Sequence, residues 1–454
     1  MITTTRSRAR LAAPVLLAGL SLTVTGCAGF GNIGNQPGVT TVTFASVNNP
    51  QMQDLAQLIP EFERTHPNIK INTLMMEEND LRNAATKDVA TEGGQYDVMT
   101  VGLYEVPIWG QNGWLVDLTD QAKQDPSYDV EDIFTPVLDG VSYQDRYYAM
   151  PFYGESSFLM YRKDLFEQAG LEMPERPTWQ QVADFAKQLK TDDRAGICLR
   201  GKPGWGEMFA PLTTMVNTFG GQWYDESWNA QVNGPGFRNA IQFYLDTLKA
   251  GGQSDPVSYG FTECLNLVGG GNAAMWYDAT SAAGSLESGP NKGKFGYVRA
   301  PVEQTKDSGW LWSWNLGINA SVKEDPEKQA AAWEFVKWAT SKEYVQLSGE
   351  RMGWPRVPSG TRASTFEIPD YLASGEEFAP LTAEIMGEVN PKQPGVAPQP
   401  WIGIQYVTIP EFQDVGNQTS QLIADVIAGR RDLDGALQDS QAIAQRAGDK
   451  QKNQ

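Results

Sequence analysis

The chain has 454 residues, with 36 Lys and Arg against 55 Asp and Glu, which gives a formal net charge of −19. This acidity argues against a nucleic-acid partner and against binding of anionic lipid through a basic face. The single histidine, His66, argues against a His-based triad or a multi-histidine zinc site, and three cysteines are too few for a Cys-based zinc or iron–sulfur site. The sequence therefore predicts no metal and no cofactor.

The N-terminus has the pattern of an export signal. Three arginines, at positions 6, 8 and 10, precede a short apolar stretch over residues 11–24. Such a stretch is too short to span a bilayer comfortably and is typical of a secretory signal peptide. We therefore expect residues 1–26 to be a signal peptide.

The signal ends in Val-Thr-Gly-Cys, which resembles a bacterial lipobox with Cys27 as the acylated residue. In proteins with this signal the cysteine becomes the first mature residue and carries the lipid. We expect Cys27 to anchor the exported protein to the outer face of the cell membrane, and residues 27–38, rich in Gly and Asn, to form a flexible tether. An ordinary buried cysteine after the signal is the alternative.

Strands and helices alternate after the tether. Strands are predicted over residues 39–47, 69–75 and 96–101, with helices over 52–66 and 81–92 between them. This order implies a parallel sheet with helices on its faces. A similar unit is expected to recur later, with a strand at 157–161 and helices at 163–169, 178–189, 237–250 and 329–340. Thr178 is the expected N-cap of the helix that it precedes.

Several segments together carry a family resemblance. In chain order they are IPEFERTHPNIKI from Ile59, QYDVMT from Gln95, NGWLVDLT from Asn112, YAMPF from Tyr148, LMYRKDLFEQAG from Leu159, TWQQVADFAKQL from Thr178, GNAAMWY from Gly271 and LGINASVK from Leu316. This series resembles the extracellular solute-binding proteins of bacterial ABC importers, in the carbohydrate-binding group. CLRGKPGWGEM from Cys198 and WLWSWNLGI from Trp310 resemble sugar-alcohol and monosaccharide binders more than maltodextrin binders.

The resemblance implies an α/β, periplasmic-binding-protein-like fold, similar to maltose-binding protein, with two α/β lobes, a ligand cleft and a multi-crossing hinge. The implied lobes are residues 39–149 with 308–356, and 150–307 with 357–447, followed by a polar tail over 448–454. Crossings are expected near Met150-Pro151, Ala300-Pro301 and Pro355 to Pro358. The implied function is capture of a sugar alcohol or sugar and its delivery to membrane permease subunits by a monomeric, non-enzymatic receptor. The chain carries no GxxxxGK[ST] phosphate loop, so a partner ATPase would supply the energy.

A polyhydroxylated ligand needs fixed hydrogen-bonding groups, and its C–H faces need flat apolar surface. The candidates for that surface are Trp205, Trp276, Trp312, Trp314 and Trp354. Core packing is the alternative for each of them. It is less convincing for Trp312 and Trp314, because alternate strand residues share one face with Trp310.

The polar candidates lie in loops and at predicted strand ends, where open α/β sheets bind ligands. They are Arg200, Asp278, Glu155, Asn49 with its neighbour Asn48, Asn315, Glu78 with its neighbour Glu77, and Tyr104. We expect Arg200 and Asp278 both to hydrogen-bond ligand hydroxyls. The alternatives are a surface salt bridge for Arg200, a helix N-cap for Asp278 and a hinge hydrogen bond for Glu155.

Two further questions stay open on the sequence alone. Cys198 and Cys264 would share an oxidising compartment, where we expect them to form one disulfide; two buried thiols are the alternative. The other function classes are a secreted carbohydrate-active hydrolase, which would use two of the many carboxylates, and a sensory or interaction protein on the same scaffold.

Overall fold

A computed structural model describes residues 38–305 and 308–452. The expected signal peptide and Cys27, with all but the last residue of the expected tether, lie outside these residues. Within the described ranges, no helix is both long and apolar enough to cross a membrane.

The first lobe is built on a five-stranded sheet in the order β2-β1-β3-β10-β6. Its strands are β1 (Thr40–Val47), β2 (Ile69–Met76), β3 (Val98–Gly102), β6 (Met150–Glu155) and β10 (Trp312–Ile318). β1 pairs in parallel with β2 and β3, whereas β10 runs antiparallel to β3 and β6. The predicted first three strands and their parallel arrangement are therefore confirmed.

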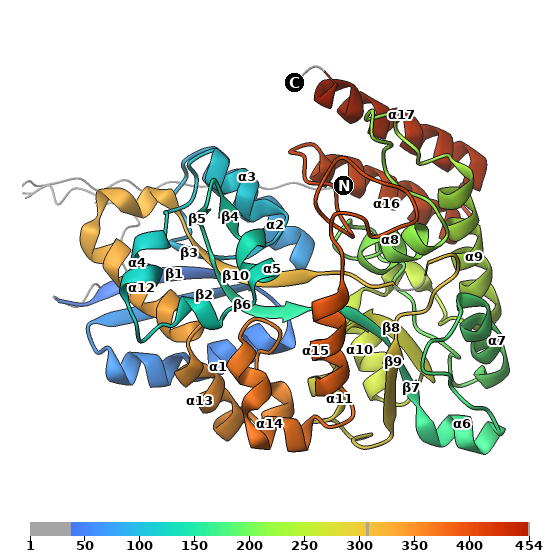
Figure 1. Ribbon diagram of the computed structural model, residues 1–454, viewed down its shortest axis with the longest axis horizontal. Helices are drawn as coiled ribbons and strands as arrows, with labels where there is room; N and C mark the ends of the chain where they lie inside the picture. The colour runs from blue at the N-terminus through green and yellow to red at the C-terminus, as the bar shows by residue number, and fades with distance from the viewer. Residues whose placement is uncertain (1–37, 306–307, 453–454) are drawn as a thin grey trace, which may run out of the picture. The chain divides into compact units, whose positions relative to one another are not determined.

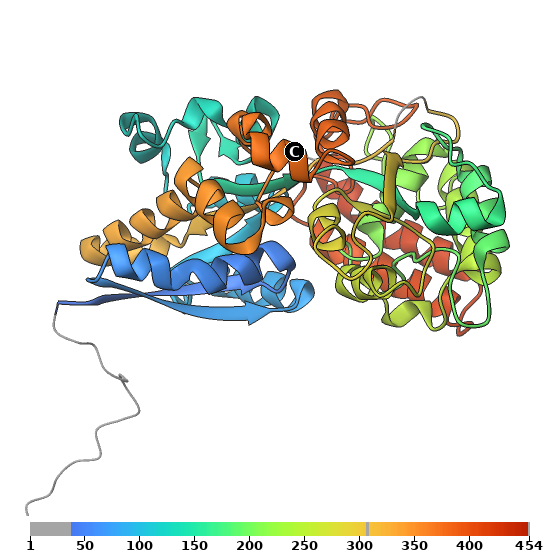
Figure 2. The same cartoon turned by 90° about the horizontal axis from the view of Figure 1, so that it is seen from below.

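Helices cover this sheet (Figures 1 and 2). Their buried apolar residues join those of the strands in one hydrophobic core. The larger ones are α1 (Pro50–Thr65), α2 (Glu78–Ala90), α12 (Pro326–Ala339) and α13 (Lys342–Met352). Asn49 caps α1 by accepting a hydrogen bond from Met52 N at 3.1 Å, and Pro50 fits the first turn. Smaller elements complete the lobe: α3 (Glu105–Gln111), η1 (Val130–Asp132), α4 (Thr119–Gln124), α5 (Thr135–Gly140), the β4 (Ser142–Tyr143) and β5 (Arg146–Tyr147) hairpin, η3 (Ala320–Glu324) and η5 (Ala363–Glu367).

The second lobe holds a three-stranded sheet in the order β8-β7-β9. Its strands, β7 (Ser157–Arg162), β8 (Met275–Ala279) and β9 (Phe295–Arg299), are all antiparallel. The expected recurrence of the parallel unit is therefore wrong for this sheet. β7 enters it directly from β6 with only Ser156 between them, so no crossover helix sets a parallel partner.

The second lobe holds most of the remaining helices (Figure 1). They are α6 (Lys163–Ala169), α7 (Trp179–Leu189), α8 (Phe209–Thr218), α9 (Pro235–Gly251), η2 (Pro256–Ser258), α10 (Phe261–Gly269), α11 (Ala282–Leu286), α15 (Ala379–Glu388), α16 (Phe412–Ile427) and α17 (Leu433–Gln451). The short helix α14 (Pro369–Ser374) lies beside α13 and packs on η5. Thr178 caps α7 as predicted, in a capping box with Gln181. Residues 448–451, expected as part of a polar tail, continue α17.

The chain passes between the two sheets at three places. The first is Ser156, because the pairing of β6 with β10 carries the first lobe to Glu155. The second is the connection between β9 and β10. The third follows η4 (Trp354–Arg356) and η5, because Arg362 between them still hydrogen-bonds Tyr128 O and Asp132 of the first lobe. Between η4 and η5, Gly154 N donates to Ser359 O at 2.8 Å, and a Cβ on Gly154 would lie 2.2 Å from the carbonyl oxygen of Gly360. The close approach of these two backbones requires glycine at both positions.

Candidate functional site

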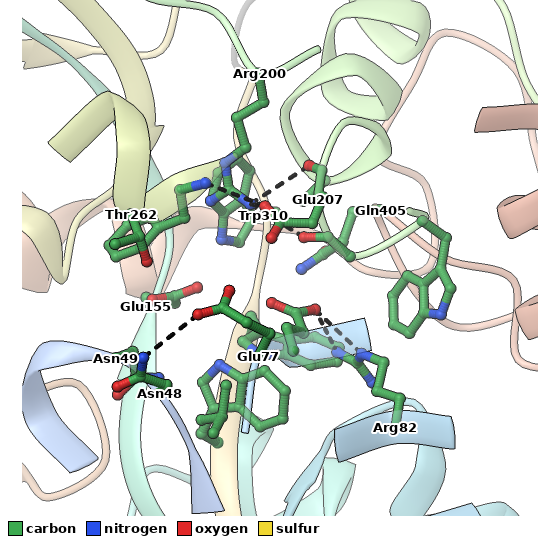
Figure 3. A pocket seen from close by; sticks show the side chains of 18 of the residues that line it. Asn48, Asn49, Glu77, Arg82, Glu155, Arg200, Glu207, Thr262, Trp310 and Gln405 are labelled. Atoms are coloured by element: carbon green, nitrogen blue, oxygen red, sulfur yellow. Dashed lines mark hydrogen bonds and ion pairs between the residues drawn. The ribbon is translucent and has the colours of Figure 1, made fainter. Parts of the chain in front are cut away.

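A cavity of about 630 Å³, partly open to solvent, lies between residues of the two lobes. Figure 3 shows Arg200, Glu207 and Gln405 facing Asn49, Glu77 and Arg82 across it, with Glu155 at one side. The full lining is Val47, Asn48, Asn49, Glu77, Glu78, Arg82, Tyr153, Glu155, Arg200, Trp205, Gly206, Glu207, Ala210, Phe261, Thr262, Trp310, Trp312, Trp314 and Gln405. Polar groups and large aromatic rings therefore share this space.

The carboxyl ends of β1 and β2 supply one wall. Asn49 follows β1, and Glu78 begins α2 directly after β2. Because these strands are parallel, their carboxyl ends meet at the same edge of the sheet. Asn49 Nδ2 donates to the Tyr153 hydroxyl at 2.8 Å, which joins this edge to β6.

Arg82 lies among three tryptophan rings at this wall. Its guanidinium carbon lies 4.2 Å from the ring centre of Trp205, 4.9 Å from that of Trp314 and 5.2 Å from that of Trp312. Trp312 and Trp314 project together because alternate residues of β10 share one face. Trp205 comes from the second lobe, so Arg82 makes a cation–π contact across the cavity.

Arg200 and Asp278 form a buried pair on the opposite wall. Residue 198 bridges in parallel to residue 276 of β8, which places Arg200 beside Asp278. Arg200 donates from Nε and Nη2 to the two carboxylate oxygens of Asp278 at 2.7 and 2.5 Å, and from Nη1 to Gly206 O at 3.0 Å. Arg200 is 4% exposed and Asp278 is fully buried. Arg200 therefore faces the cavity with Asp278 behind it.

Two cavity carboxyls bind protons unusually tightly. Burial raises the pKa of Glu155 to about 7, against the opposing effects of the Ser281 hydroxyl and Arg200. Burial likewise raises the pKa of Glu78 to about 7; Arg82 opposes the rise and Glu207 adds to it. Both groups can accept hydrogen bonds when ionised and donate one when protonated, which suits a hydroxylated ligand.

Residues 48–346 match the family model of the bacterial extracellular solute-binding proteins. The chain belongs to this family. It is 43% identical over 407 residues to the mannitol-binding protein of Pseudomonas aeruginosa, covering 88% of this chain and 91% of that one. The expected family is therefore confirmed.

The fold of this chain is also similar to that of solved structures. An ABC transporter solute-binding protein from Agrobacterium vitis with bound D-mannitol matches with a TM-score of 0.87 and 44% identity, covering 90% of this chain and 99% of the other. One from Agrobacterium radiobacter in complex with ribitol matches with a TM-score of 0.80 and 26% identity, covering 90% and 100%. The two-lobed α/β fold predicted from the sequence is confirmed.

Seven of the predicted site residues line the cavity of this solute-binding protein. They are Asn49, Glu78, Glu155, Arg200, Trp205, Trp312 and Trp314, and the neighbours Asn48 and Glu77 line it too. Glu155 was considered either as a ligand-binding residue or as a hinge hydrogen-bond partner, and its position fits both. It lines the cavity, and it accepts a 2.5 Å hydrogen bond from Ser281 near the first crossing.

The other five predicted residues do not line it. Asp278 sits behind Arg200, and it is a strand residue of β8 rather than the helix N-cap considered as its alternative. Asn315 points to the opposite face from Trp314 and donates to Val101 O at 2.9 Å. Trp276 packs with Phe261 in the core, and Trp354 packs on Gly349. The Tyr104 hydroxyl donates to Ile409 O at 2.9 Å, so it links the two lobes without lining the cavity.

Several lining residues were missed by sequence reasoning. Arg82 lies one helical turn after Glu78, so the i, i+4 spacing could have found it. Glu207 and Gln405 lie in irregular segments without a periodic signal. Gln405 comes from a stretch that none of the family-like segments covers.

Cys198 and Cys264 lie at disulfide-bonding distance in the structure, with Cα atoms 5.7 Å apart. Both are fully buried. Cys198 precedes Arg200 by two residues, and Cys264 follows Phe261 and Thr262 on α10. A bond here connects two segments that line the cavity. Among the described residues, no three His, Cys, Asp or Glu side chains are grouped to hold a metal ion.

Proposed function

We propose that this solute-binding protein is the sugar-alcohol-binding component of an ABC importer, with an acyclic pentitol or hexitol in the cavity. The observation that carries the proposal is the composition of the cavity. Carboxylates, guanidinium groups and amides from both lobes surround a space that also exposes tryptophan rings. Each ligand hydroxyl needs a donor or acceptor in place of water, and the carbon chain needs apolar surface.

Unpartnered polar atoms support a polar occupant. Gln405 Oε1 and the indole N–H groups of Trp205 and Trp310 are buried, line the cavity and have no hydrogen-bond partner among the described residues. Buried polar atoms are seldom left unpaired. Hydroxyls spaced along a flexible chain are well suited to pair with such separated groups.

The relatives support the same ligand class. One relative is a mannitol-binding protein, and the two similar structures hold D-mannitol and ribitol. Both ligands named there, mannitol and ribitol, are acyclic polyols. Lobe closure around the ligand would then present the loaded protein to the permease subunits.

A thermal-shift screen tests the ligand. A ligand present at 100 times its Kd stabilises the folded state by about 2.7 kcal/mol. We expect D-mannitol, D-sorbitol or ribitol to raise the melting temperature of the protein, and maltose to leave it unchanged. A shift with maltose alone, or with no polyol, would contradict the proposal. No new reducing ends should form from oligosaccharides, whereas a hydrolase would release them.

We further propose that the exported protein is a lipoprotein anchored through Cys27. The lipobox-like sequence before Cys27 supports this proposal. Cys27→Ala should move the protein from the membrane fraction to the soluble fraction and leave the polyol-induced thermal shift intact. Retention of the exported variant in the membrane fraction would exclude this anchor.

A further inference from the structure

The positive charges of the cavity are already paired within the protein. Arg82 is held by Glu78, at 3.0 Å from Nη2, and by a short contact with Glu105. Arg200 is held by Asp278 on two nitrogens and lies 3.5 Å from Glu207. Lys202, near the rim, lies 3.5 Å from both Glu77 and Glu207. None of these cations is left over to neutralise a carboxylate or phosphate on a ligand.

The negative charges are not fully paired. Four glutamates line the cavity, against two arginines. Of these four glutamates, Glu155 alone forms no salt bridge with a described Lys or Arg. It is nevertheless only 8% exposed. Among the described residues, the hydrogen bond recorded for its carboxylate is the 2.5 Å contact from the Ser281 hydroxyl to Oε2. Figure 3 shows the carboxylate of Glu155 beside the central space.

Burial is the main factor that disfavours the ionised form of Glu155. Burial raises the pKa of Glu155 to about 7, the Ser281 hydroxyl and Arg200 lower it, and Asp278 and Glu78 raise it by smaller effects. Tyr153 on the same strand is neutral, and its hydroxyl oxygen accepts a hydrogen bond from Asn49. A buried carboxylate without a cation is costly, and a cationic ligand group would supply the missing partner.

We propose that the polyol site is charge-selective, so that it also binds protonated amino-alditols, whose terminal ammonium pairs with Glu155, and excludes anionic sugar acids and alditol phosphates. This inference rests on the proposed function, because the hydroxylated chain must occupy the same cavity. Glu155 is then the residue that reads the charge of the ligand.

Titration calorimetry with three ligands of one carbon skeleton tests the inference: D-mannitol, protonated 1-amino-1-deoxy-D-mannitol and D-mannonate. Charge-assisted hydrogen bonds exceed neutral ones by about 1 kcal/mol, or about 5-fold in affinity. At pH 8 we expect the amino-alditol to bind about 5-fold more tightly than mannitol, and mannonate to bind at least about 50-fold more weakly.

Glu155→Gln identifies the residue responsible. The variant should weaken mannitol binding modestly and amino-alditol binding about 5-fold more, so the preference for the amine disappears. Glu263→Gln is the matched control, because Glu263 also contacts Lys202 and its side chain is 38% exposed, but it does not line the cavity. It should keep the preference. In the unmodified protein, the amine preference should grow from pH 6 to pH 8.5 as Glu155 ionises, while the ammonium, with a pKa near that of lysine, stays charged. Burial also raises the pKa of Glu78 to about 7, so the part of this rise that Glu155→Gln removes is the part that belongs to Glu155.

Each outcome separates the two proposals. Three results would overturn the charge selectivity alone, provided that mannitol binds. They are equal affinity for mannitol and the amino-alditol, an equal loss of affinity for both ligands in Glu155→Gln, and tight binding of mannonate. Failure of the unmodified protein to bind any polyol would overturn the proposed function and this inference with it.

Discussion

Replacing Asp278 with Asn tests how the buried pair supports the site. Asp278 is fully buried and takes two of the hydrogen bonds of Arg200, which is itself 4% exposed. Breaking a buried ion pair by removing one charge typically costs about 3–5 kcal/mol, because the other charge stays buried without its partner. The remaining carboxylate, Glu207, lies 3.5 Å away and compensates only in part.

The loss of stability can be converted into a melting temperature. With an unfolding entropy of about 2.1 cal/mol/K per residue, a loss of about 4 kcal/mol lowers the melting temperature by about 4 °C if the whole chain unfolds together. The shift is about 8 °C if the second lobe unfolds separately. Differential scanning calorimetry measures it. Polyol affinity should fall about 3- to 30-fold, because Arg200 lines the cavity and loses the group that orients it.

Asp164→Asn is the matched control. Asp164 also forms a two-nitrogen pair with an arginine, Arg162, but its side chain is 31% exposed and does not line the cavity. Its replacement should cost less than about 1 kcal/mol. Equal stability of the two variants would refute the reasoning. Loss of binding in Asp278→Asn with unchanged stability would instead indicate direct contact between Asp278 and the ligand.

Three further predictions concern the same lobes. Mass mapping without reductant should recover Cys198 linked to Cys264; alkylation of both thiols would exclude the bond. Trp314→Ala should weaken polyol binding by about 1–3 kcal/mol, or about 5- to 150-fold, as for a buried anchor, whereas Trp333→Ala, outside the cavity, should bind normally in the same titration. Because burial raises the pKa of Glu155 from 4.5 to about 7, its contribution to stability is fully present below about pH 4.5 and is lost as the pH rises through 7. Glu155→Gln should therefore remove about 1–3 kcal/mol of the fall in unfolding free energy between pH 5 and pH 8, and an unchanged slope in urea titrations would contradict this.

The parts of the site that follow from regular structure could be predicted. Asn49 and Glu78 were found because the carboxyl ends of parallel strands meet at one edge. Trp312 and Trp314 were found because alternation places them on one face of a strand. The same alternation places Asn315 on the opposite face from Trp314, where it donates to Val101 O.

The rest depends on contacts between distant segments. Asp278 was expected at the ligand, but the bridge between Cys198 and Trp276 places it under Arg200 instead. Gln405 reaches the cavity from a segment without helical or strand periodicity. No local pattern reports such a contact, because it arises only when the two lobes fold around the cavity.

A crystal structure with the alditol that gives the largest thermal shift tests the central claim most directly. We expect the ligand to lie between Trp312 and Arg200, with its hydroxyls hydrogen-bonded to Arg200 and Glu155 and to residues of both lobes. A ligand bound elsewhere, or a cavity left unoccupied at saturating alditol, would contradict the account.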